Sequence, residues 1–315
     1  MNTKRLDWID IAKGIGIILV VLGHTLVPQV RETGFAGFLW IFIYNFHMPL
    51  FFFLSGYLFE KGLFHYTNKG KFTLGKLQYL MLPYLIFSTF AYLFIGFSLK
   101  IPLLAKVLEN GGYTAVDLKD AILQIVTYNN HIDKHLWFVF SLFIVFLVNI
   151  LIPKIMKSKP MLIVLLGLYI SKAYVHYYGI LDYVTSDLLF FSLARIAFNT
   201  GNKKSINTIV TAVIFVVTNC LYSYFYVTQM PSGVLKGVLY LIRSISSVTG
   251  IMTVCNISKH LQNNFLCRIR TLFRIQQLLC YKKIQCLSSL LFSLHTDQIT
   301  APVRYLIPDC SYLLR

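Results

Sequence analysis

Three side chains capable of acid–base or anion chemistry share one apolar stretch near the amino terminus: Asp10, Lys13 and His24. A helix advances about 100° per residue, so the eleven positions from Lys13 to His24 place both side chains on one stripe, roughly 16 Å apart along the axis. Asp10 lies on the same face as Lys13, one turn earlier, where the two can pair. Ionisable side chains within a spanning helix are costly and by default mark function.

A signal peptide or a simple membrane anchor is the alternative for this stretch, with Lys4 and Arg5 as its basic flank. The apolar region of a signal peptide does not normally contain residues such as Lys13 and His24, and no A-x-A cleavage site follows it. The sequence therefore favours a functional helix over an export signal.

The composition of the 315-residue chain is that of a membrane protein. Hydrophobic residues make up 57% of it, charged residues only 13%, and the mean hydropathy is +0.66. Soluble domains are less apolar, so we expect an all-α fold, a polytopic bundle of transmembrane helices. The net charge of +17 could suggest nucleic acid as a partner. No nucleic acid is expected, however, because the basic residues lie largely between apolar runs and no nucleic-acid-binding motif accompanies them.

The cysteines carry little information about function. None of the six cysteines belongs to a C-x-x-C pair, and their spacing is not typical of zinc sites. Neither a disulfide framework nor a metal site is therefore expected.

Eight apolar runs have a length suited to the bilayer, which requires about 20 residues per helix. They lie at about 9–27, 38–59, 77–99, 136–152, 161–178, 183–198, 206–227 and 234–255. The short basic loops between them all fall on one side. By the positive-inside rule that side is the cytoplasm. We therefore predict a multi-pass protein of the cell membrane, surrounded by membrane lipid, with its amino terminus in the cytoplasm.

The sequence changes character after about residue 265. Residues 266–315 are basic, contain four of the six cysteines and have no run of 18 apolar residues. Two explanations remain open: residues 266–295 form a basic amphipathic helix on the inner leaflet, or the segment results from a shifted reading frame. We expect a membrane domain over residues 1–265 and an atypical basic tail over residues 266–315.

Two blocks of sequence, RLDWIDIAKGIGIILVVLGH at 5–24 and FHMPLFFFLSGYLF at 46–59, resemble the acyltransferase 3 family of integral membrane O-acyltransferases. Within that family the chain most resembles the group named after fucose 4-O-acetylase. The family pattern is an arginine or lysine, ten residues and a histidine, and Lys13 and His24 occupy those positions. Members have more spans than the eight recognised here, so the resemblance implies that the last two family spans are missing or altered.

The resemblance implies transfer of an acyl group, commonly acetyl from acetyl-CoA, to a hydroxyl of a cell-surface or lipid-linked carbohydrate, with polysaccharide-assembly proteins as further partners. A sugar hydroxyl is a poor nucleophile near neutral pH, and histidine is the natural general base for its proton. We expect His24 to be that base and Lys13 to hold the phosphates of coenzyme A. Asp10 would keep Lys13 charged and oriented. For His24, a hydrogen-bonded interior histidine is the alternative.

Further candidate residues lie near other helix ends. His47, ahead of Pro49, is expected about three turns into the second helix, where it would position the acceptor or a carbonyl oxygen or have a structural role. Lys76 could add to the phosphate site, although positive-inside placement alone accounts for it. The candidate substrate-binding residues are His135, Trp137 and Arg243. For Trp137 an interfacial anchor and a stacking platform for a sugar both remain open.

Two arginines lie inside apolar runs, where an unpaired charge is expensive. Arg243 is far enough within the last predicted helix to suggest that it lines a cavity. Arg195 is expected to snorkel toward the cytoplasmic surface.

Two other classes of function compete with acyl transfer. In a small-solute or proton-coupled transporter, Asp10, Lys13 and His24 would form a relay. Transporters often contain internal repeats, and the later half of the chain holds no second copy of the K-x10-H block. The other alternative is an inactive acyltransferase, truncated or frameshifted near residue 265.

Overall fold

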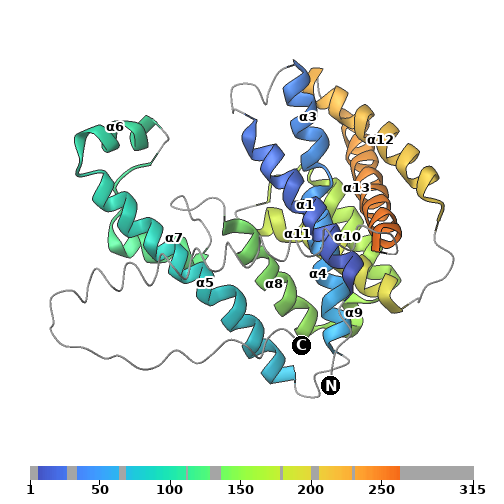
Figure 1. The fold of residues 1–315 in the computed structure, drawn as a ribbon, viewed down its shortest axis with the longest axis horizontal. Coiled ribbons are helices and arrows are strands. Elements are labelled where there is room, and N and C mark those ends of the chain that lie inside the picture. The colour runs from blue at the N-terminus through green and yellow to red at the C-terminus, as the bar shows by residue number, and fades with distance from the viewer. Residues whose placement is uncertain are drawn as a thin grey trace, which may run out of the picture. The chain divides into compact units, whose positions relative to one another are not determined.

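The computed structural model describes residues 6–26, 34–63, 69–110, 113–127, 136–177, 180–199, 206–228 and 231–262. The regular structure in these ranges is helical and contains no strand (Figure 1). The helices are α1 (Asp7–Thr25), α3 (Gly34–Tyr44), α4 (His47–Leu63), α5 (Lys69–Ser98), α6 (Pro102–Asn110), α7 (Leu118–Thr127), α8 (Trp137–Leu151), α9 (Pro153–Met156), α10 (Lys159–Ser171), α11 (Ile180–Asn199), α12 (Thr208–Thr228) and α13 (Gly233–Gln262).

Five helical stretches of the described part are long and apolar enough to cross a membrane: α1, the run of α3 and α4, α5 from Gln78, α12 and α13. α8 and α10 are apolar but shorter. α11 has 20 residues and carries Asp182, Asp187 and Arg195. Helices satisfy their own backbone hydrogen bonds, which is the requirement that the bilayer imposes on a spanning segment. The predicted fold class, an all-α polytopic bundle, is confirmed.

α4 lies at the centre of the packing, in contact with α1, α11 and α13. Its Leu50, Phe52 and Leu54 are completely buried. α4 approaches α11 closely at Gly56, where an added Cβ would lie 2.4 Å from the backbone oxygen of Phe191. Small residues at such a position let two helix backbones approach within a membrane. The close contact between α4 and α11 therefore depends on Gly56.

The second predicted helix is interrupted, which the sequence pattern did not indicate. α3 ends at Tyr44, a turn follows at Asn45 and Phe46, and α4 begins at His47. His47 is therefore the first residue of α4, rather than a residue three turns into a continuous helix. Pro49 lies in the first turn of α4, where a missing backbone N–H costs no helical hydrogen bond.

Several other boundaries differ from those predicted. α5 begins at Lys69, well before the predicted start at residue 77. The expected outer connection after residue 99 contains α6 and α7, and the Tyr84 hydroxyl of α5 donates a 2.7 Å hydrogen bond to the backbone oxygen of Ile125 in α7. α10 ends at Ser171, seven residues before the predicted end at residue 178. The proposed basic tail, residues 266–315, lies outside the described residues.

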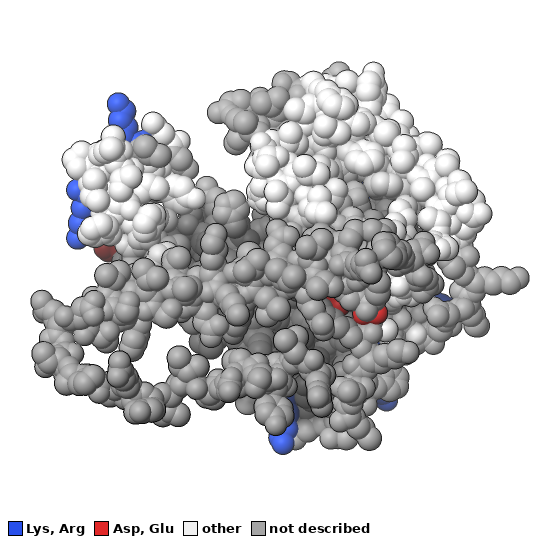
Figure 2. All heavy atoms as spheres, in the orientation of Figure 1, with Lys and Arg blue, Asp and Glu red and all other residues white. Residues whose placement is uncertain are grey.

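The surface over α3 and α12 is nearly free of charge, as Figure 2 shows on the upper right. Large apolar side chains are exposed there, with Phe35 at 74%, Ile209 at 72% and Val217 at 60% of their full accessible surface. A broad exposed apolar surface is unfavourable in water and is expected of a lipid-facing helix. This face agrees with a multi-pass membrane protein.

Candidate functional site

His24 lies in the last turn of α1, with its side chain exposed. The structure brings it close to the end of α3, where its imidazole meets the Tyr44 ring edge-to-face with centroids 6.4 Å apart. The Tyr44 ring in turn contacts the His47 imidazole edge-to-face, with centroids 4.6 Å apart. Two imidazoles and one phenol from three helices therefore lie in a row, which we call the His24–Tyr44–His47 row.

The packing of α1 against α3 fixes the middle member of this row. Gly23 is buried, and an added Cβ there would lie 2.7 Å from the Tyr44 ring. On the other side, Tyr44 packs against the indole of Trp40, with ring centroids 4.6 Å apart. Glycine before His24 thus leaves the room that Tyr44 needs beside the histidine.

His47 is the buried member of the row, with 2% of its surface exposed. Its Nδ1 lies 2.9 Å from the backbone oxygen of Ile43. A carbonyl oxygen can only accept, so Nδ1 carries the proton in this contact and Nε2 is the ring atom that can accept a hydrogen bond. The last turn of α3 therefore orients the imidazole.

Polar side chains from two later helices hold the turn between α3 and α4. Asn219 of α12 accepts a 2.7 Å hydrogen bond from the Asn45 side chain and donates one of 2.9 Å to the backbone oxygen of Phe42. Ser247 of α13 donates a 2.5 Å hydrogen bond to the backbone oxygen of Asn45. A helix break leaves backbone groups without helical partners, and in a bilayer only neighbouring protein groups can satisfy them. These contacts explain why the chain tolerates a break at this depth.

Asp10 and Lys13 share α1 with His24, as predicted, and both side chains are partly exposed. The eleven-residue spacing from Lys13 to His24 corresponds to roughly 16 Å along the helix. Lys13 therefore cannot contact the His24–Tyr44–His47 row directly. A ligand that engages both must be extended along α1.

Arg243 lies within α13, ten residues after its first residue, Gly233. Its guanidinium carbon lies 5.5 Å from the ring centroid of Tyr222 and 5.9 Å from that of Tyr240. Its Nε is buried and has no hydrogen-bond partner among the described residues. The guanidinium of Arg243 therefore lies beside aromatic rings of α12 and α13, and the residue as a whole is partly buried. The cavity expected beside it stays a prediction.

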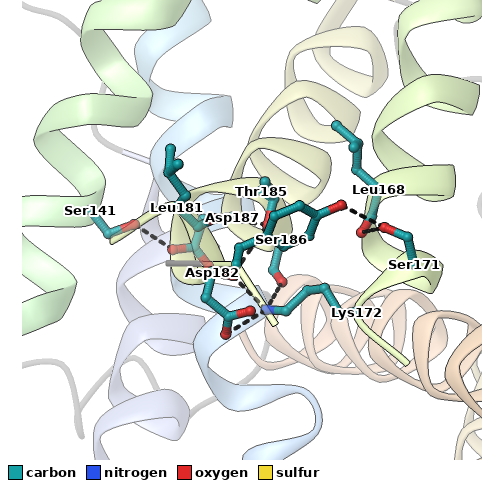
Figure 3. Close-up of polar contacts among 10 residues, drawn as sticks. Ser141, Leu168, Ser171, Lys172, Leu181, Asp182, Thr185, Ser186 and Asp187 are labelled. Atoms are coloured by element: carbon teal, nitrogen blue, oxygen red, sulfur yellow. Dashed lines mark hydrogen bonds and ion pairs between the residues drawn. The ribbon is translucent and has the colours of Figure 1, made fainter. Parts of the chain in front are cut away.

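A second polar cluster joins α8, α10 and α11 (Figure 3). Figure 3 shows Lys172 reaching from the end of α10 toward α11, where its Nζ bonds the backbone oxygen of Asp182 at 2.5 Å and the Ser186 hydroxyl at 2.8 Å. The same Nζ lies 3.1 Å from Asp182 Oδ2. On the opposite side of α11, Ser141 donates a 2.5 Å hydrogen bond to the buried Asp187 carboxylate.

Lys172 lies in the turn after α10, outside the helices themselves. Burial lowers the pKa of its ammonium group, and the carboxylate of Asp182 opposes this change. Lys172 therefore has its counterion and its hydrogen-bond acceptors within the cluster.

Two of the predicted substrate-binding residues, Trp137 and Arg243, lie in different helices, α8 and α13. Trp137 is the first residue of α8, and its ring lies 4.6 Å from that of the exposed Tyr183, centroid to centroid. This aromatic pair fits an interfacial anchor and a stacking platform equally well. His135 lies outside the described residues, as does the side chain of Lys76 within α5.

Arg195 does not snorkel to a surface, contrary to the prediction. It is 1% exposed, its Nε donates a 2.9 Å hydrogen bond to Glu60 Oε2, and its Nη1 donates one of 2.6 Å to Asn149 Oδ1. Lys157 pairs with the other oxygen of Glu60. Arg195 thus lies within a buried ion-pair network that links α4, α8 and α11. Pairing over such sequence distances was not visible in the hydrophobic pattern.

Several side chains of these clusters were not predicted from the sequence, Tyr44 and Asp187 among them. Tyr44 lies among other aromatic residues in the predicted span 38–59, and Asp187 lies in the predicted span 183–198. Asp187 could have been singled out as an acid within an apolar run, whereas no sequence signal distinguishes Tyr44 from the other aromatic residues. Within the described ranges, no group of three or more His, Cys, Asp or Glu side chains could hold a metal ion.

The fold and these clusters define a class: a multi-pass membrane protein with ionisable side chains placed inside a helical bundle. A family model described as an acyltransferase domain, Acyl_transf_3, matches residues 6–269, most of the chain. The protein therefore belongs to the acyltransferase 3 family. No curated protein and no solved structure matches the chain.

Proposed function

We propose that this protein transfers an acyl group, acetyl from acetyl-CoA or the acyl group of a related coenzyme A thioester, to a hydroxyl of a cell-surface or lipid-linked carbohydrate. The proposal is supported chiefly by family membership over residues 6–269. The fucose 4-O-acetylase-like group, the acetyl donor and the carbohydrate acceptor belong to the proposal.

His24 acts as the general base in this proposal. It accepts the proton of the acceptor hydroxyl, whose oxygen attacks the thioester carbonyl, and the carbon–sulfur bond breaks. The departing thiolate then accepts this proton from the His24 imidazolium. The exposure of His24 at the end of α1 leaves room for both reactants. The Tyr44 ring lies against the His24 imidazole, and the oriented His47 lies against the Tyr44 ring. Tyr44 and His47 are thus positioning residues.

Lys13 binds the phosphates of the donor, and Asp10 keeps Lys13 charged and oriented. The distance of roughly 16 Å between Lys13 and His24 suits an extended donor that lies along α1. Lys76 adds charge at the donor side, while His135 and Trp137 contact the acceptor. This arrangement requires the amino terminus on the cytoplasmic side of the cell membrane, where coenzyme A thioesters are made. Polysaccharide-assembly proteins are the proposed partners.

The experiment uses the purified full chain in nanodiscs with acetyl-CoA and measures release of the free thiol. We expect release with the unaltered protein and loss of turnover in His24→Ala. His176→Ala is the matched control, because His176 is an exposed histidine in the segment after α10. Lys13→Met should mainly raise the donor concentration required. Normal turnover in His24→Ala would overturn the base assignment, and absence of turnover in the unaltered protein would overturn acyl transfer by this chain.

A further inference from the structure

Arg243 differs from the other cations of the bundle because no carboxylate of the described residues pairs with it. The other interior cations have carboxylate partners: Arg195 pairs with Glu60, and Lys172 with Asp182. No carboxylate of the described residues lies within ion-pair distance of Arg243, and its Nε has no hydrogen-bond partner among them. An arginine remains charged at all physiological pH values, so its charge cannot be removed by deprotonation.

The surroundings of Arg243 are tyrosines rather than acids. The phenol groups of Tyr169, Tyr222, Tyr226 and Tyr240 lie near its guanidinium. Contacts with two of these rings contribute about 0.5–2 kcal/mol each, but a tyrosine ring does not neutralise the charge. Arg243 as a whole is only partly buried, so a ligand can reach its guanidinium.

A hydroxyl near Arg243 is also without a partner. Ser246, three residues further along α13, is completely buried, and its Oγ forms no hydrogen bond within the described ranges. A guanidinium and an adjacent hydroxyl are the groups that proteins use to bind phosphate or carboxylate, since arginine can donate two parallel hydrogen bonds to either.

The position of Arg243 along its helix relates it to His24. Lys259, near the end of α13, lies over the Trp8 ring at the start of α1, with 5.2 Å between its Nζ and the ring centroid, so the two helices run in opposite directions. His24 comes sixteen residues after Trp8, and Arg243 sixteen residues before Lys259. Both residues therefore lie about 24 Å along their helices from this common contact.

This distance along the helices distinguishes the acceptor side of the proposed site from the donor side. Lys13 lies only five residues after Trp8, about 8 Å along α1. An anion at Arg243 therefore lies about as far from the contact of Trp8 with Lys259 as His24 does. Lys13, which the proposed function assigns to the donor phosphates, lies much nearer to that contact.

We propose that Arg243 binds an anionic group, a phosphate or carboxylate, carried by the acceptor, so that the acceptor is an acidic or phosphorylated carbohydrate rather than a neutral one. This inference rests on the proposed function. The guanidinium holds the anion while the hydroxyl to be modified approaches His24.

The test measures binding and does not require turnover. The purified chain in nanodiscs is titrated with three probes, methyl glucuronide, glucose 1-phosphate and neutral methyl glucoside, and thermal stabilisation is recorded. We expect the two anions to bind at least about tenfold more tightly than the neutral sugar, and Arg243→Gln to abolish that preference. Lys236→Gln, which removes a cation from the same helix, should preserve it. Arg243→Lys should retain part of it, because the charge remains.

Binding of labelled coenzyme A to the same variants identifies the source of the anion. Arg243→Gln should leave coenzyme A binding unchanged. Loss of coenzyme A binding in Arg243→Gln would assign the anion to the donor and overturn the proposal. Equal binding of the anionic and neutral probes by the unaltered protein would overturn it as well.

The results that would refute the proposed function differ from those that would refute the anion site. Arg243-dependent binding of the anions without any cleavage of acetyl-CoA would support the anion site while refuting acyl transfer. Cleavage of acetyl-CoA without a preference for anionic probes would refute the anion site alone.

Discussion

The buried pair of Glu60 and Arg195 provides a quantitative test of the packing. Glu60→Leu would leave Arg195 inside the bundle without a counterion. The side chains of Arg195 and Glu60 are only 1% and 4% exposed, so solvent cannot replace the lost carboxylate. Removal of one partner of a buried pair costs about 3–5 kcal/mol, equivalent to a reduction of the folding equilibrium constant by about a hundredfold to several thousandfold.

Lys157→Met is the matched control for this substitution. Lys157 also pairs with Glu60, but its side chain is 31% exposed, so its loss should cost about 1 kcal/mol or less. The assay is reversible unfolding of the purified chain in mixed micelles, followed by tryptophan fluorescence. The double variant Glu60→Leu with Arg195→Met should be more stable than Glu60→Leu alone, because it removes the stranded charge.

Either of two results would refute this reasoning. In the first, Glu60→Leu is no more destabilising than Lys157→Met. In the second, the double variant loses as much stability as Glu60→Leu and Arg195→Met lose together. Either outcome would mean that Glu60 does not neutralise Arg195 within a water-excluded interior.

Three further substitutions test the close contacts. Gly56→Ala should destabilise the fold by about 1–3 kcal/mol, because its Cβ would meet a backbone oxygen of α11 at 2.4 Å, as measured by unfolding in mixed micelles. Asn219→Ala should cost about 1–3 kcal/mol in the same assay, since it leaves polar groups of the turn between α3 and α4 without partners. Gly23→Ala should lower the rate of thiol release from acetyl-CoA by displacing the Tyr44 ring, without a comparable loss of stability.

Neighbouring substitutions serve as controls for these three. Gly167→Ala on α10 and Gly96→Ala on α5 add a Cβ where no atom lies within 4 Å, so both should be as stable and as active as the unaltered protein. Thr218→Ala removes a hydroxyl that bonds only within α12 and should cost less than the Asn219 substitution. Equal effects in a variant and its control would contradict the contact assigned to that position.

The sequence was sufficient to locate most of the helices. Long apolar runs interrupted by basic loops predict spanning helices because the bilayer imposes both length and hydrophobicity. The interruption between α3 and α4 could not be predicted in this way. Its backbone groups are satisfied by Asn219 and Ser247, which lie more than 170 residues later in the chain, and hydrophobic periodicity carries no information about such partners.

The candidate site was only partly accessible to sequence reasoning. The spacing of Lys13 and His24 on one helix follows from local geometry and is present in α1. The neighbours of His24 depend on how α3 packs against α1, so Tyr44 emerged only from the structure. The environment of Arg195 is likewise tertiary, because Glu60 and Asn149 come from two other helices.

The most direct test of the central claim is transfer of label into carbohydrate. Membranes containing the full chain are incubated with acetyl-CoA labelled in its acetyl group, and alkali-labile label is counted in the glycan and glycolipid fractions. We expect incorporation with the unaltered protein and with His176→Ala, and none with His24→Ala. Incorporation that does not depend on His24, or its absence from the unaltered protein, would contradict acyl transfer at the His24–Tyr44–His47 row.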